Sequence, residues 1–155
     1  MNGLRLIFRW NMISLLKNNK IQLGSRILLA AVFIFAGIEK AANPGDFSVA
    51  VSNYRILPLF LINITAIFIP WLELSSGILL LFGKWIKANS LILTALLIVF
   101  NVLIIVAILR GLDIECGCFG TLDAQMVGLQ KLAENFFLIF VGLIVYKFSP
   151  DSDVE

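Results

Sequence analysis

The stretch that decides the fold is residues 88–109, which reads ANSLILTALLIVFNVLIIVAIL. It contains no charged residue and few polar ones. About 20 apolar residues in helical conformation are enough to cross the hydrocarbon core of a bilayer. The stretch therefore predicts a membrane-spanning helix, in which Asn101 is expected to hydrogen-bond to a neighbouring helix.

The rest of the chain has the same apolar character. Hydrophobic residues make up 60% of the sequence and charged residues 14%, with a mean hydropathy of +0.98. Soluble domains have about 45–50% apolar and about 25% charged residues. Further spans are predicted at residues 23–42, 59–82 and 132–148. We therefore expect an all-α integral membrane four-helix bundle, one domain over residues 23–148, with the lipid bilayer as its first partner.

The segments outside the spans are short. Residues 1–22 mix large apolar side chains with arginines, which is typical of an amphipathic interfacial segment; a frayed terminus is the alternative. A second interfacial helix is expected at residues 46–57, capped by Asp46 and resting its apolar side on the bilayer. Residues 149–155 are expected to form a cytoplasmic tail.

The distribution of lysine and arginine predicts the orientation, because these residues are enriched on the cytoplasmic side. Eight lie before the first span, in the second loop or at the end of the last span: Arg5, Arg9, Lys17, Lys20, Arg26, Lys84, Lys87 and Lys147. The opposite side has four: Lys40, Arg55, Arg110 and Lys131. We expect a multi-pass protein of the bacterial inner membrane, with both termini cytoplasmic and the loop after residue 109 periplasmic.

That loop contains both cysteines of the chain, Cys116 and Cys118, separated by one glycine. A disulfide across one residue is strained and therefore easily reduced, which suits a disulfide donor or relay better than a structural bond. It closes almost no loop, so it adds little stability. Two alternatives remain open: a soft-metal site, although no metal is assigned, and two neighbouring small buried side chains.

Three charged residues in or beside the spans are further candidates for the site. Glu73 lies deep in the second span, where a charge costs about 2.5–3.5 kcal/mol and must face the bundle interior. It either moves protons or has a structural role, pairing with Lys40 or hydrogen-bonding Trp71. Glu39 is a second candidate proton carrier, whereas Lys40 is expected to extend to the outer interface.

Several function classes have no support in the sequence. The chain has no histidine, which excludes catalytic triads and histidine-based zinc or haem sites. Neither a phosphate-binding glycine loop nor a dinucleotide fingerprint is present. Its basic residues are scattered at membrane boundaries, so nucleic-acid binding is not expected.

Four motifs resemble those of the MauE family, methylamine-utilisation membrane proteins grouped with the DoxX-like four-helix proteins. They are AGIEK at residues 36–40, NYRILP at 53–58, PWLEL at 70–74 and RGLDIECGCFG at 110–120. The resemblance implies a four-helix membrane bundle and a role in disulfide formation or in maturing an exported enzyme. It assigns the redox role to Cys116 and Cys118, and the family's charged helical positions to Lys40 and Glu73.

The leading hypothesis is a membrane thiol-disulfide oxidoreductase that exchanges electrons with a periplasmic thioredoxin-like or substrate protein. A quinone near Phe119 and Trp71 is the candidate cofactor, and oligomeric state is open. One alternative is a non-catalytic assembly subunit that docks an exported partner. The other is a carrier of soft metal or small solutes through the bundle.

Overall fold

The computed structural model describes residues 19–55, 57–110 and 129–149, and this part of the chain is helical with no strand. The helices are α2 (Asn19–Ala42), α3 (Pro44–Asn53), α4 (Leu59–Phe82), α5 (Ile86–Leu109) and α6 (Leu129–Phe148). The predicted all-α membrane fold is confirmed, and each long helix begins and ends within four residues of its predicted span.

Three of the described helices, α2, α4 and α5, are long and apolar enough to cross a membrane. The fourth predicted span corresponds to α6, a 20-residue helix that is not among these three. It carries Lys131 and Glu134 near its start and Lys147 near its end. The chain is a multi-pass membrane protein, and the predicted count of four spans is approximate.

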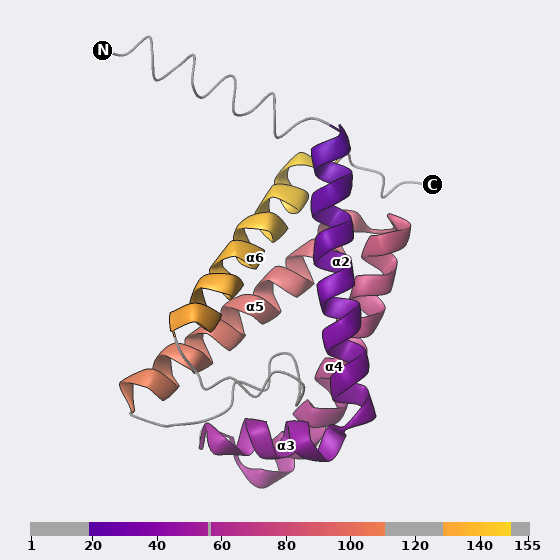
Figure 1. Cartoon of the computed structure of the whole chain (residues 1–155). Coiled ribbons are helices and arrows are strands. Elements are labelled where there is room, and N and C mark those ends of the chain that lie inside the picture. Colours follow the sequence, from indigo (N-terminus) through magenta and orange to yellow (C-terminus); the bar gives the residue numbers. More distant parts are fainter. Residues whose placement is uncertain (1–18, 56, 111–128, 150–155) are drawn as a thin grey trace, which may run out of the picture.

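The four long helices form a ring (Figure 1). Helix α2 packs most extensively against α4, and α5 against α6, while contacts of α2 with α6 and of α4 with α5 close the ring. Successive long helices run in opposite directions, so α2 begins at the end where α6 finishes. The other end, called the α3 end below, has α3, the start of α4 and the finish of α5 (Figure 1).

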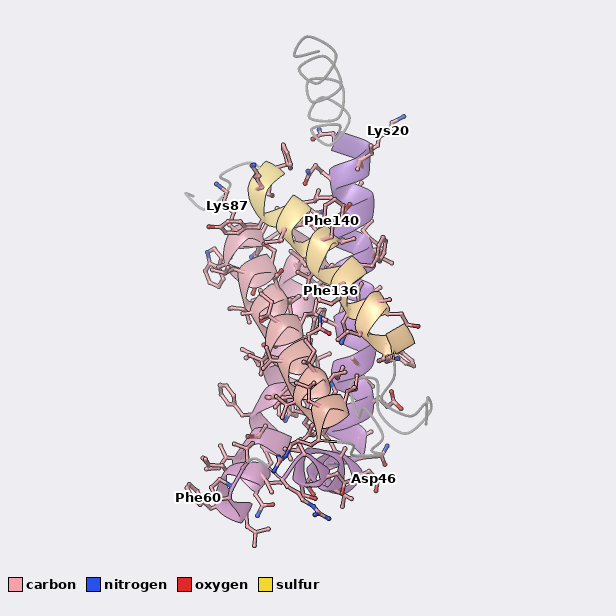
Figure 2. The ribbon with its side chains drawn as sticks, turned by 90° about the vertical axis from the view of Figure 1, so that its left-hand side faces the viewer. Lys20, Asp46, Phe60, Lys87, Phe136 and Phe140 are labelled. Carbon is pink, nitrogen blue, oxygen red and sulfur yellow. The ribbon has the colours of Figure 1, made fainter. Side chains whose placement is uncertain are left out.

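Apolar side chains form three clusters among the described residues and also cover the outside of the ring. The larger of the two main clusters includes Leu29, Leu80 and Leu93, all fully buried, and the smaller one joins Phe47 of α3 to Phe100 of α5. Large apolar side chains on the outer faces are exposed, as expected for a surface in contact with lipid. Figure 2 shows Phe136 and Phe140 on this outer surface of α6.

The short helix α3 differs from its prediction in both extent and contacts. It begins at Pro44 and ends at Asn53, and Asn43 rather than Asp46 is its N-cap residue. Proline is well suited to the first turn of a helix because the amide hydrogen that it lacks has no partner there. Phe47 and Tyr54 are each 5% exposed, so the apolar face of α3 packs on the bundle and not on the bilayer.

Helices α2 and α4 approach most closely at Gly37. A Cβ atom added at this glycine would lie 2.9 Å from the backbone nitrogen of Leu74 and 3.0 Å from the carbonyl oxygen of Pro70. Both neighbours are backbone atoms of α4, which cannot move aside as a side chain can. Gly37 therefore sets the separation of the two helices that carry Lys40 and Glu73.

We predict that Gly37→Ala lowers the stability of the bundle by about 1–3 kcal/mol, the usual cost of overpacking. Gly24→Ala is the matched control on the same helix, because a Cβ there has nothing within 4 Å. Thermal unfolding of the detergent-purified variants would measure both effects. Equal melting temperatures for the two variants would contradict this account of the contact between α2 and α4.

Candidate functional site: a buried ion pair at the centre of the bundle

Lys40 of α2 and Glu73 of α4 form a salt bridge inside the ring. The Lys40 Nζ atom donates to both carboxylate oxygens of Glu73, at 2.8 Å to Oε1 and 2.7 Å to Oε2. The two side chains are each 1% exposed. The structural role predicted as one alternative for Glu73, pairing with Lys40, is thus present. The prediction that Lys40 extends to the outer interface is wrong.

The directions of the two helices explain why these side chains meet. In any α-helix the Cα–Cβ bonds tilt toward the N-terminus of the helix. Because α2 and α4 are antiparallel, Lys40 tilts away from the α3 end and Glu73 tilts toward it. Lys40 lies only two residues before the end of α2, yet its long side chain reaches back into the bundle.

Two aromatic rings complete the surroundings of the ammonium group. The Lys40 Nζ atom lies 5.4 Å from the ring centre of Phe47 and 5.0 Å from that of Phe100. A cation this close to the face of an aromatic ring is stabilised by about 0.5–2 kcal/mol. Sequence analysis missed both phenylalanines, since nothing in their spacing separates them from ordinary apolar positions.

The other predicted site residues differ in where the structure places them. Glu39 is adjacent to Lys40 in α2 and is 9% exposed. Trp71 is 62% exposed on the outer surface of α4, which argues against a role in holding a cofactor inside the bundle or in bonding Glu73. Cys116, Cys118 and Phe119 lie outside the described residues. Within the described part, no three cysteine or acidic side chains gather as a metal site would require.

An apolar pocket of about 270 Å³ lies beside the ion pair, between α3, α4 and α5. Phe47 and Phe100 belong to its wall, so the rings that contact Lys40 also face this pocket. Tyr54 and Thr65 are among the few polar residues that line it. Its lining suits a lipophilic molecule and does not include Trp71.

The last residue before the cysteine-bearing segment is attached to α3. Arg110 follows α5, and its Nη1 atom donates to the carbonyl oxygen of Tyr54 at 3.3 Å. The segment that carries both cysteines therefore follows directly from the α3 end, where α5 finishes (Figure 1).

One known protein family matches the sequence over all the described helices. The sequence model described as "Methylamine utilisation protein MauE" matches residues 18–148. The chain belongs to the MauE family. Two of the motifs that resemble the family, AGIEK and PWLEL, contain the residues that meet at the centre of the bundle: Gly37 and Lys40 in the first, Pro70 and Glu73 in the second.

Three curated relatives have similar sequences, and each is named methylamine utilization protein MauE. The protein from Paracoccus denitrificans is 29% identical over 77% of this chain and 65% of its own length. The protein from Methylophilus methylotrophus is 32% identical over 68% of this chain and 56% of its own length. The protein from Methylorubrum extorquens is 28% identical over 71% of this chain and 60% of its own length. The match thus covers less than two thirds of each MauE relative. No solved structure matches the chain.

We predict that removing one partner of the ion pair is far more harmful than removing both. Lys40→Met or Glu73→Gln alone leaves a buried group without its partner and is expected to cost about 3–5 kcal/mol, whereas Lys40→Met with Glu73→Leu recovers most of that loss. Thermal unfolding of the three variants would measure this coupling.

Glu134→Gln is the matched control for Glu73→Gln. Glu134 pairs with Lys131 at 3.3 Å but is 44% exposed, so its loss is expected to cost at most about 1 kcal/mol. Additive losses in the double variant would mean that Lys40 and Glu73 are not energetically coupled.

Proposed function

We propose that this MauE-family protein is a membrane thiol-disulfide redox protein whose reactive couple is Cys116 and Cys118. The observation that supports this most is that both cysteines of the chain come soon after α5, which finishes at the α3 end. The buried ion pair and the lipophilic pocket lie toward the same end. We infer that the pair supports disulfide formation or maturation of an exported protein.

The proposed reaction is disulfide exchange followed by regeneration. A thiolate of the partner attacks the Cys116–Cys118 disulfide, giving a mixed disulfide that the second partner thiol resolves. The partner then holds a disulfide and the two cysteines are thiols, so two electrons and two protons have moved to this protein. A quinone that accepts these electrons and protons becomes a quinol and restores the disulfide.

The pocket between α3, α4 and α5 is the proposed binding site of that quinone. Its apolar walls match a lipophilic ring, and Phe47 and Tyr54 bring it close to the segment that starts at Arg110. The sequence predicted a quinone near Trp71, but Trp71 lies on the outer surface, and the pocket takes its place as the proposed quinone site. Proton-carrying roles for Glu73 and Glu39 stay predictions, and the two-oxygen contact of Glu73 with Lys40 favours a structural role for Glu73.

The proposed location is the bacterial inner membrane, with the α3 end in the periplasm. Lys20 and Lys87 lie at the opposite end of the bundle from Asp46 and Phe60 (Figure 2). A concentration of lysine at one end is typical of the cytoplasmic side. The α3 end would then face an oxidising compartment, where a periplasmic thioredoxin-like or exported protein can reach the cysteines.

We predict that one of the two single variants, Cys118→Ser or Cys116→Ser, traps a partner that the wild-type protein releases. Disulfide exchange is reversible, so the remaining thiolate can attack the disulfide of the oxidised partner, which forms a mixed disulfide and leaves the second partner sulfur as a thiol. This chain then lacks the second cysteine that would attack the mixed disulfide and release the partner in its reduced form. Acid-quenched cells, alkylated and separated without reductant, should show a disulfide-linked band in one single variant and none in the Cys116→Ser/Cys118→Ser double variant.

The double variant also separates the candidate functions. Normal formation of the partner's disulfides in cells that carry it would contradict the redox proposal and favour a non-catalytic assembly subunit. Metal that co-purifies with the reduced wild-type protein but not with the double variant would instead favour a soft-metal carrier.

A further inference from the structure

A small cavity lies where the four long helices meet. Its volume is about 10 Å³, and α2 and α5 supply its apolar walls, including Phe33, Ala36 and Leu97. Two polar side chains line it, Glu73 of α4 and Asn135 of α6. The cavity thus lies between the ion pair and α6.

The carboxamide of Asn135 has no hydrogen-bond partner among the described residues. Its side chain is 1% exposed, and neither Oδ1 nor Nδ2 makes a hydrogen bond within the described structure. Leaving a buried polar group without a partner costs about 1–3 kcal/mol, and such groups are rare in folded proteins. The polar face of the cavity therefore lacks a hydrogen-bonding ligand.

Asn101 of α5 lies at the level of Asn135. Gly142 of α6 packs directly against Thr94 of α5. Moving seven residues, or about two turns, along each antiparallel helix from that contact places Asn101 opposite Asn135. Asn101 is 4% exposed, and both its polar side-chain atoms also lack a partner among the described residues, so the expected bond to a neighbouring helix is not formed.

We propose that this cavity binds one water molecule, held between the carboxylate of Glu73 and the carboxamide of Asn135. The volume agrees with the requirement of a single water, about 10–15 Å³. Each carboxylate oxygen of Glu73 accepts one bond from Lys40 and retains a second lone pair for a water hydrogen. The water can also donate its other hydrogen to Oδ1 of Asn135 or accept a hydrogen bond from Nδ2. Asn135 is then a positioning residue, which acts on Glu73 through the water.

The test is X-ray hydroxyl-radical footprinting of the purified full chain, read by mass spectrometry. Radicals generated from bound water label the side chains next to it even when bulk water cannot reach them. Leu97 lines the cavity, whereas Leu93, one turn away on the same helix, does not. Both belong to the larger apolar cluster, and they are 4% and 0% exposed. We expect Leu97 to be labelled several-fold faster than Leu93.

Two variants remove the water in different ways. Asn135→Leu replaces the carboxamide by an apolar group of similar size, and Ala36→Val fills the cavity from α2. In either folded variant the labelling rate of Leu97 should fall to that of Leu93. Equally slow labelling of Leu97 and Leu93 in the wild-type protein would overturn the proposal, as would fast labelling of Leu97 that persists in a folded variant.

Discussion

A salt bridge buried among membrane helices constrains the position of everything around it. Either charge alone would cost several kcal/mol in the hydrocarbon region, so Lys40 and Glu73 must stay within hydrogen-bonding distance. This requires α2 and α4 to pack closely, and Gly37 permits it by letting backbone meet backbone. Phe47 and Phe100 then exclude lipid from the ammonium group, which brings α3 and α5 to the same point.

The pair also divides the interior of the ring. The larger apolar cluster lies toward the end with Lys20 and Lys87, while the smaller one, which contains Phe47, lies toward the α3 end. Between the two clusters lies a layer of polar groups that includes Lys40, Glu73 and Asn135. An apolar helix does not require such groups in order to be stable in a membrane. Buried polar groups of this kind fix which helix faces meet, because any other register leaves a charge or a carboxamide in an apolar environment.

The sequence predicts much of the fold and part of the site. Uninterrupted apolar runs locate α2, α4, α5 and most of α6, and the depth of Glu73 in its span marks it as an interior residue. The direction of Lys40 could not be predicted, because a lysine near a helix end can reach outward to the interface or inward to a partner on another helix. Asn135 lies near the start of α6 and looks like an interface residue until the register with α5 is known.

We propose above all that Cys116 and Cys118 form an oxidised pair on the periplasmic side of the membrane. The most direct measurement is labelling of Cys116 and Cys118 in intact cells with a membrane-impermeant maleimide, before and after mild reduction. The account predicts no labelling before reduction and labelling of both cysteines afterwards, without permeabilising the membrane. Labelling that requires permeabilised cells, or that is complete without any reductant, would contradict it.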